Sequence, residues 1–338
     1  MLTTSYPRHA GDTAGTFVRD GVEHLRAAGH EVVVVSPASF RHFGIAYGDG
    51  IVNNLRARPW KALLLPAFLA SFAAAARRAA RGADVVHAHW LPSALPALAT
   101  GLPFVLQLWG SDVALARRVA PLARRLVRRA SVVIVASTAL ATEARALGGS
   151  DVRVVPSPVA VPPVVGEPDE PPHVLYVGRL SPEKGVAALA TATSGLPRVI
   201  VGDGPLRDLF PDCVGFVPPE EVSGYYARAA VVAVPSEREG YGMAAREAMA
   251  HGRPVVASAV GGLLDVVEDG VTGVLVPPGD GVALREALLS LLADPGLRAR
   301  LGAAARDRVA ASLGPTAVTA ALTAAYRDAA GTRAAGTG

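Results

Sequence analysis

Short apolar runs alternate along the chain with alanine-rich stretches of helical length. In the first half, such runs lie at 31–37, 84–90, 103–109, 131–137 and 152–158. A second series lies at 173–179, 197–203, 213–217, 231–236, 254–258 and 272–278. Short, continuously apolar runs are typical of strands buried on both faces of a sheet, and helices between them are typical of parallel neighbours. The pattern therefore predicts two α/β domains, each a doubly wound parallel sheet.

A proline-rich stretch, PSPVAVPPVVGEPDEPP at 156–172, separates the two series and suits neither helix nor strand. We interpret it as an extended, semi-rigid linker between the domains. The predicted boundaries are 1–158 for the first domain, 159–172 for the linker, 173–312 for the second domain, 313–330 for a C-terminal helix that packs back toward the first domain, and 331–338 for a flexible tail.

Composition agrees with a folded protein, since 51% of the 338 residues are hydrophobic and 18% are charged. Cys213 is the only cysteine, which excludes a disulfide framework and favours the cytoplasm. No signal peptide is apparent at the start. The apolar segment 62–76 contains Pro66 and is shorter than the roughly 20 residues of a membrane span, so we expect a buried or interfacial helix there.

Charge is unevenly distributed along the chain. Residues 1–160 carry 18 Lys and Arg against 9 Asp and Glu, a net +9, whereas residues 161–338 carry 15 against 20, a net −5. Arginine pairs recur at about helical spacing in RRVAPLARRLVRRAS, 117–131. They fit either a solvated helix face or a contact with an anionic surface. No aromatic platform or nucleic-acid motif accompanies them, so we expect no nucleic acid partner.

Two loops at predicted strand ends suit anion binding, because ligands of such sheets bind beyond the carboxyl ends of the strands. Gly15 and Thr16 stand at the start of a helix expected over 17–28, where backbone can approach a phosphate; a simple capped turn fits equally well. Arg179 and Lys184 flank the turn in VGRLSPEKG, and two cations there can neutralise a diphosphate without a metal ion. A pair of solvated surface charges is the alternative.

A third loop, SEREGYGMAAREAMA at 236–250, combines carboxylates with a helix start. The turn is expected to expose Glu239, while Gly242 and Met243 begin a helix whose free N–H groups face a ligand. Glu247 follows a little over one turn into that helix. Carboxylates accept hydrogen bonds from vicinal hydroxyls, so the loop predicts a polyol beside an anion-binding helix start. Glu237 is expected to be a solvated flank.

These motifs, with VGDGP and GG…VVEDGVTGVLVPPGD in the same order, resemble the retaining glycosyltransferases of family four over nearly the whole chain. The resemblance implies the GT-B fold, in which two Rossmann-like doubly wound domains face each other across a cleft. It further implies transfer of a sugar from a nucleotide diphosphate sugar to an acceptor without a metal ion or other cofactor. The first domain would be the acceptor side and the second would bind the donor.

The resemblance also implies roles for individual residues. Arg179 and Lys184 would bind the diphosphate, Glu239 the hydroxyls of the donor sugar, and Glu247 the ribose. The catalytic set would be Arg179, Lys184 and Glu239. Further donor-binding residues would be Gly15, Thr16, Phe216, Val217, Tyr241, Gly242 and Met243, with the backbone around Gly215 to Val217 meeting the nucleobase.

Two features depart from the family pattern. Many relatives carry a histidine where this chain has Trp109 in LQLWGSDV, although Gly110, Ser111 and Asp112 match. The first strand also lacks the apolar residues that normally precede LTTSYP, so it is expected to be short or clipped by a misplaced start. His87 and His89 share one strand face as a metal pair could, but no third ligand stands out. We expect His89 and Asp112 on the acceptor side instead.

The sequence thus predicts a cytoplasmic glycosyltransferase acting on a sugar, glycan or lipid-linked acceptor. The basic first domain and segment 62–76 further predict peripheral association with the inner face of the cytoplasmic membrane. An inactive nucleotide-sugar-binding protein is the alternative, suggested by Trp109. A nicotinamide-dependent oxidoreductase fits less well, because no Gly-x-Gly-x-x-Gly follows the first strand.

Overall fold

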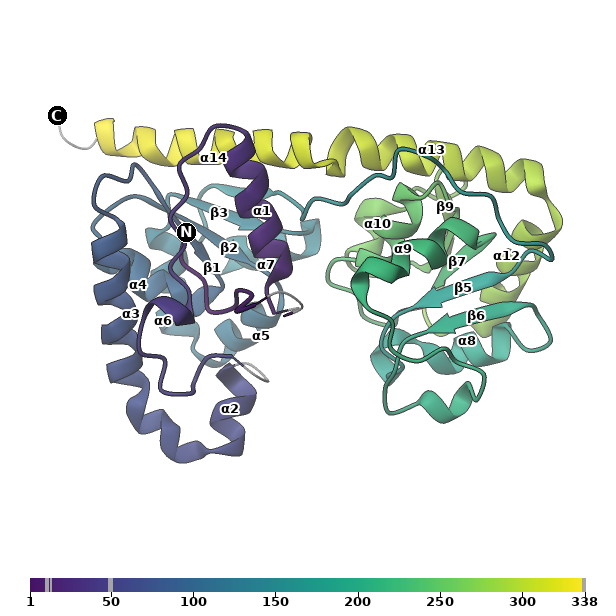
Figure 1. Ribbon diagram of the computed structural model, residues 1–338, viewed down its shortest axis with the longest axis horizontal. Helices are drawn as coiled ribbons and strands as arrows, with labels where there is room; N and C mark the ends of the chain where they lie inside the picture. Colours follow the sequence, from purple (N-terminus) through teal and green to yellow (C-terminus); the bar gives the residue numbers. More distant parts are fainter. Residues whose placement is uncertain (10–11, 13, 48–50, 336–338) are drawn as a thin grey trace. The chain divides into compact units, whose positions relative to one another are not determined.

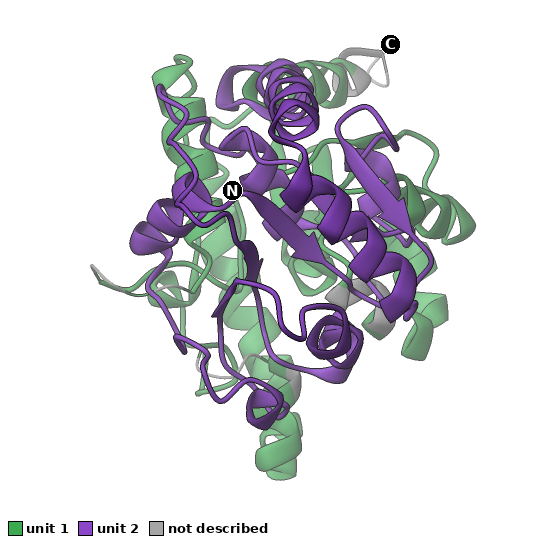
Figure 2. Cartoon of the chain, turned by 90° about the vertical axis from the view of Figure 1, so that its right-hand side faces the viewer, with its two compact units in different colours: residues 1–157, 318–338 green, residues 158–317 purple. Residues whose placement is uncertain are grey.

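The computed structural model describes residues 1–9, 12, 14–47 and 51–335. The chain forms two compact units, coloured separately in Figure 2. Unit 1 contains residues 1–157 and 318–338, and unit 2 contains residues 158–317. Strands occur at nine of the eleven apolar runs of the sequence.

Unit 1 contains a four-stranded parallel sheet in the order β1-β2-β3-β4. Its strands are β1 (Val86–His89), β2 (Phe104–Leu108), β3 (Val132–Val135) and β4 (Val152–Val154). Leu2 extends the sheet by parallel bridges to Ala88 of β1 and to Val35. The strand predicted at 31–37 was wrong, because only Val35 pairs and the residues before it are partly exposed.

Helices cover this sheet, and the last of them comes from the end of the chain (Figure 1). They are α1 (Thr16–Ala27), α2 (Ile51–Ala57), α3 (Leu65–Ala79), α4 (Ala94–Ala99), α5 (Ser111–Arg118), α6 (Ala120–Arg129), α7 (Thr138–Ala146) and α14 (Pro315–Ala335). Val318, Leu322 and Ala325 of α14 pack with Val105 of β2 and Ile134 of β3 in one apolar core. Burial of that apolar face holds α14 on unit 1.

Unit 2 contains a five-stranded parallel sheet in the order β6-β5-β7-β8-β9. Its strands are β5 (Val174–Val177), β6 (Arg198–Val201), β7 (Val231–Val234), β8 (Val255–Ser258) and β9 (Gly273–Val276). The strand predicted at 213–217 was wrong. Only Gly215 bridges to Val201, and its φ of +89° interrupts the extended backbone.

Helices pack on both faces of this sheet and enclose two apolar cores. They are α8 (Val186–Ala192), α9 (Pro219–Arg228), α10 (Met243–Ala250), α11 (Leu263–Val266), α12 (Gly281–Ala293) and α13 (Pro295–Leu313). Leu175 of β5 faces one core while its neighbours Val174 and Tyr176 face the other, as the alternation of a strand requires. The sheet is therefore doubly wound.

The proline-rich segment 159–172 has neither helix nor strand, and it packs against unit 2. Val159 is buried in one core, and its N–H donates to the carbonyl of Leu313 over 2.9 Å. The guanidinium groups of Arg253 and Arg306 donate to the carbonyls of Gly166 and Pro162. These contacts hold the segment extended along the surface of the unit.

Candidate functional site

The chain order of unit 2 places a topological switch point between β5 and β7. From β5 the chain passes to β6 on one side, and it then returns to β7 on the other side. Crevices at such points, beyond the carboxyl ends of the strands, are the usual ligand sites of open α/β sheets. The loop after β5 contains Arg179 and Lys184, and the loop after β7 contains Glu239. The sheet thus brings together the cations and the carboxylate that sequence reasoning selected.

Close backbone contacts fix these two loops against each other. Gly185, with φ +65°, lies so near the end of β7 that a Cβ atom there would be 1.8 Å from the carbonyl oxygen of Pro235. The N–H groups of Glu237 and Arg238 donate to the carbonyl of Glu183 over 3.0 and 3.3 Å. Only glycine satisfies both the left-handed backbone and the missing space at position 185.

An ion pair joins the loops through their side chains. Lys184 Nζ donates to Glu239 Oε2 over 2.7 Å, and Ser236 Oγ donates to the same oxygen over 3.2 Å. The N–H of Gly242 lies 3.2 Å from Glu239 Oε1, and that of Tyr241 lies 3.5 Å away. Glu239 is 13% exposed, so the expectation that the turn exposes it was wrong. The carboxylate instead occupies the start of α10, where N–H groups and the helix dipole favour an anion.

The electrostatics of Glu239 follow from this geometry. Burial would raise the pKa of the carboxyl, but the hydrogen bond and charge of Lys184 and the N–H groups of Gly242 and Tyr241 outweigh burial. The pKa of Glu239 therefore lies below its usual value. An ammonium group has three N–H donors, so Lys184 can hold Glu239 and contact a phosphate oxygen at the same time.

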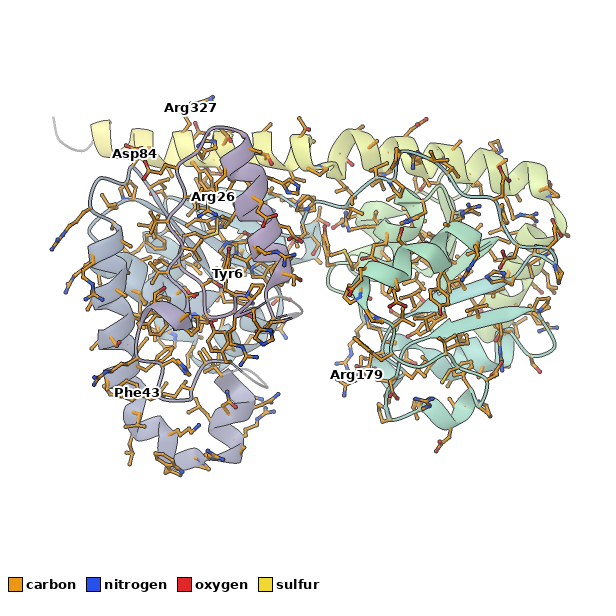
Figure 3. All side chains as sticks on the ribbon, viewed as in Figure 1. Tyr6, Arg26, Phe43, Asp84, Arg179 and Arg327 are labelled. Carbon is orange, nitrogen blue, oxygen red and sulfur yellow. The ribbon has the colours of Figure 1, made fainter. Side chains whose placement is uncertain are left out.

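Arg179 adds a second cation at this edge. Its side chain is exposed and reaches outward from the loops of unit 2 (Figure 3). Its carbonyl accepts a hydrogen bond of 2.8 Å from the hydroxyl of Tyr176, which fixes the start of the loop. No ion pair holds its guanidinium among the residues that the structure describes. Arg179 is therefore placed to receive an anion from solvent.

Glu247 lies on α10 and is bound by a partner that the sequence did not reveal. Tyr226 of α9 donates its hydroxyl to Glu247 Oε2 over 2.9 Å. Burial raises the pKa of Glu247, and the Tyr226 hydrogen bond opposes that shift. Tyr226 is 21 positions away on another helix, so no local pattern in the sequence links the two.

The remaining donor-side residues lie around the same helix start and the neighbouring segment. Met243 is the first residue of α10 and is partly exposed, and the Tyr241 ring lies 4.2 Å from the guanidinium carbon of Arg246. Phe216 is 73% exposed, whereas the Val217 side chain is packed into the core of unit 2. A ligand at this segment can therefore meet the Phe216 ring and the backbone, but not the Val217 side chain.

Unit 1 has its own switch point, between the Leu2 segment and β1. Gly15 caps α1 there with φ +71°, and a Cβ atom on it would lie 2.4 Å from the carbonyl oxygen of Ser5. Thr16 is the first residue of α1. The preceding loop includes residues 10, 11 and 13, which lie outside the described residues. The structure gives the backbone of Asp112 in the first turn of α5, and its side chain also lies outside the description.

An aromatic cluster, not predicted from the sequence, lies at this edge of unit 1. It comprises Phe17, Trp90 and Trp109, with ring centroids 4.7 to 6.2 Å apart, and all three are partly exposed. Trp90 follows β1 with φ +64°, which is uncommon for a residue with a side chain. Such backbone strain persists where the surrounding structure enforces it and concentrates at ligand sites.

His89 lies behind this cluster. Its ring stacks on that of Trp109, with centroids 5.8 Å apart, and only 4% of the residue is exposed. Burial holds the pKa of His89 well below its usual value. His87 stacks on His89 at 4.3 Å, and its Nδ1 lies 2.7 Å from the hydroxyl of Tyr326. In the described part of the chain, no group of three or more His, Cys, Asp or Glu side chains is arranged to hold a metal ion.

Two family models match the chain. Residues 12–160 match the model described as glycosyl transferase 4-like domain, and residues 171–294 match the one described as glycosyl transferases group 1. The D-inositol 3-phosphate glycosyltransferase of Frankia alni is 32% identical, over 94% of this chain and 95% of that protein. The D-inositol 3-phosphate glycosyltransferase of Xylanimonas cellulosilytica is 43% identical, but only 39% of its length is matched. The alpha-D-kanosaminyltransferase of Streptomyces kanamyceticus is 34% identical, with 46% of its length matched.

Solved structures agree with these matches. Sucrose-phosphate synthase from Thermosynechococcus elongatus superposes with a TM-score of 0.74 at 25% identity, covering 92% of each chain. Anabaena HepE in complex with UDP superposes with a TM-score of 0.70 at 20% identity, covering 93% of this chain and 96% of that one.

Proposed function

Because the chain belongs to the group 1 glycosyltransferases, we propose that it moves a sugar from a nucleoside diphosphate to an acceptor hydroxyl with retention of anomeric configuration. The predicted family and the predicted GT-B fold are confirmed, since both α/β units and both family models are present. The chain is a glycosyltransferase that uses nucleotide sugars. UDP is the proposed nucleotide, by similarity to the complex of Anabaena HepE.

The observation that carries the proposal is the Lys184–Glu239 ion pair at the switch point of unit 2, with Arg179 exposed beside it. Cleavage of the bond between sugar and phosphate leaves negative charge on the β-phosphate. Lys184 and Arg179 would stabilise that charge as it develops, without a metal ion. Preorganised charges of this kind contribute most where the transition state gains charge.

The two carboxylates would hold different parts of the donor. Glu239, fixed by Lys184 and by the start of α10, would accept hydrogen bonds from hydroxyls of the transferred sugar. Glu247, with one oxygen held by Tyr226, retains lone pairs for the two ribose hydroxyls. The ribose would thus be bound at the helix and the sugar at the loop.

The acceptor would bind on unit 1, where Phe17, Trp90 and Trp109 present partly exposed rings. Aromatic faces contact the apolar C–H faces of sugar rings, and their burial supplies binding energy. A sugar, a glycan or a lipid-linked sugar is therefore the proposed acceptor class. His89 lies behind Trp109 and would act through the orientation of that ring.

A panel of nucleotide diphosphate sugars in a thermal-shift assay tests the donor proposal. A ligand at a hundred times its Kd stabilises the folded state by about 2.7 kcal/mol, which raises the melting temperature by a few degrees. The donor found in this way is then supplied with candidate acceptors, and the anomeric configuration of the product is determined by NMR. Donor binding without any turnover would favour the inactive binding protein, and no stabilisation by any nucleotide would contradict both.

A further inference from the structure

The two most exposed large apolar side chains in the described part of unit 1 lie on one projecting hairpin. α2 leads into the 3₁₀ helix η2 (Pro59–Leu64) and then into α3, and this hairpin lies at the opposite end of the unit from α14 (Figure 1). Leu63 is 83% exposed, Trp60 58% and Phe43 38%. We name these three residues the apolar tip.

The tip is held in place by polar contacts beneath it. A 3₁₀ helix has three residues per turn, so Trp60 and Leu63 lie on the same side of η2. Lys61 lies on another side, is 8% exposed, and donates from Nζ to the carbonyl of Gly44 over 2.7 Å. That bond places Phe43, whose φ is +52°, next to η2. Phe43 is also labelled on unit 1 in Figure 3.

The apolar tip is exposed although the helix beside it packs into an aromatic core. Below it, Phe40 stacks on Phe72 at 4.2 Å, and Phe68 and Phe72 are buried. By length and composition alone, the helical stretch Pro59–Ala79 could cross a membrane. The stretch Pro295–Gly331 passes the same test. Because α3 buries one face, with Phe68 and Phe72, in unit 1, the first of these stretches is an amphipathic helix of that unit with an exposed beginning.

Cationic residues lie close to the tip in the sequence. Arg41, Arg56 and Arg58 are exposed, and none of the ion pairs found among the described residues includes them. The sequence from 32 to 83 contains seven Lys and Arg against one acidic residue, Asp49. Tryptophan and leucine enter the boundary between headgroups and acyl chains, while arginine binds lipid phosphates.

We propose that the apolar tip, with Arg41, Arg56 and Arg58, docks unit 1 on an anionic lipid bilayer. Trp60 and Leu63 enter the interface, and the arginines pair with headgroup phosphates. The protein then lies peripherally on the membrane and does not span it. Binding of this kind is independent of the transfer reaction, so it can be measured without donor or acceptor.

Co-sedimentation with vesicles of phosphatidylcholine, alone or mixed with phosphatidylglycerol, tests the proposal. We expect the wild type to bind the mixed vesicles, more weakly at high salt. The double variant W60S/L63S should lower the partition coefficient about tenfold or more. R56Q/R58Q should lower it about 25-fold at low salt, at about fivefold for each arginine. The matched controls are V282S/L289S, two exposed apolar residues of α12, and R124Q/R125Q, two exposed arginines of α6.

Fluorescence locates the contact independently. Brominated lipids should quench the wild type, and the W60F variant should lose that quenching while Trp90 and Trp109 still emit. No binding to either vesicle, or loss of binding in R124Q/R125Q but not in W60S/L63S, would overturn the proposal. So would ultracentrifugation showing that the wild type self-associates and that W60S/L63S is monomeric, because the tip would then bind a second copy of the chain.

Discussion

The ammonium group of Lys184 lies 2.7 Å from Oε2 of Glu239, so a cation after β5 and a carboxylate after β7 form one ion pair. The pair is partly buried, with 31% of the Lys184 side chain and 13% of that of Glu239 exposed. The hydrogen bond and charge of Lys184 thus help to hold the pKa of Glu239 below its usual value. Replacing either residue changes the remaining partner as well as removing a contact to substrate.

Replacement of Lys184 with alanine should lower turnover by roughly 10²-fold or more, because it removes charge that stabilises the leaving diphosphate. It should also raise the pKa of Glu239, since burial remains and the opposing cation is gone. The residual activity should then fall at a higher pH than in the wild type as the solution is acidified. A pH–rate profile measures both effects.

Arg179→Ala should show a similar loss of turnover without the shift in the profile, because no contact joins Arg179 to Glu239 in the described structure. Arg198→Ala is the matched control, since it breaks an ion pair with Asp212 at the opposite end of β6. Near-normal rates in both Lys184→Ala and Arg179→Ala would disprove the proposed phosphate contact.

Replacement of Glu239 and replacement of Glu247 should have different effects on nucleotide binding. Glu239→Gln should impair sugar transfer more than binding of the bare nucleoside diphosphate, whereas Glu247→Ala should weaken that binding itself. Tyr226→Phe removes a hydrogen bond that lowers the pKa of Glu247, so binding should be lost at a higher pH on acidification. Calorimetry with the bare nucleotide over a range of pH is the measurement. Equal losses in the Glu239 and Glu247 variants would refute the division of roles.

The sequence was sufficient to predict the two parallel sheets, because each of the nine strands lies in a short, mostly apolar run. The prediction of strands failed where strand formation depends on the segment with which an apolar run pairs. Residues 32–35 are all valine, yet only Val35 finds a partner, in Leu2. Residues 213–217 are also apolar, yet Val214 and Phe216 are 47% and 73% exposed around Gly215. An apolar run does not reveal how long its partner strand is.

The site was predictable to the level of loops and not to the level of side-chain pairs. Strand ends and helix starts select Arg179, Lys184 and Glu239, because the carboxyl edge of a parallel sheet collects them. The Tyr226–Glu247 bond and the cluster around Trp109 join residues from separate elements. Such contacts depend on tertiary packing, and no local spacing encodes them.

Gly185→Ala should disrupt the donor site, since a Cβ atom would lie 1.8 Å from the carbonyl oxygen of Pro235 and φ is +65°. The loop must move, which would separate Lys184 from Glu239 and weaken nucleotide binding by tenfold or more. Gly195→Ala is the matched control, because its φ is +72° but nothing lies within 4 Å of the added atom. It should cost only about 1 kcal/mol of unfolding free energy. Circular dichroism and calorimetry compare the two, and equal effects would show that backbone strain alone matters.

Unit 1 should lose stability as the pH falls below about 6.5, the usual pKa of histidine. Burial lowers the pKa of His87 to about 3 and that of His89 well below its usual value. The unfolded chain therefore binds protons that the native state excludes, and each histidine contributes up to about 1.4 kcal/mol per pH unit. His89→Phe should reduce the slope of the unfolding free energy against pH by the contribution of about one histidine. All three tryptophans lie in unit 1, so urea unfolding followed by their fluorescence reports this unit. Identical slopes in variant and wild type would contradict the prediction.

Trp109→Ala should impair the acceptor side and leave the donor side intact. Removal of the ring takes away part of the proposed acceptor platform, so the KM for the acceptor should rise tenfold or more while nucleotide affinity stays unchanged. It also admits water to His89, on whose ring Trp109 stacks, so the pKa of His89 should rise toward its ordinary value. Titration of the imidazole by NMR measures the second effect, and Trp109→Phe, which keeps an aromatic ring, should show little of either. A His89 that titrates as in the wild type after Trp109→Ala would mean that Trp109 does not shield it, and an unchanged acceptor KM would place the acceptor elsewhere on the protein.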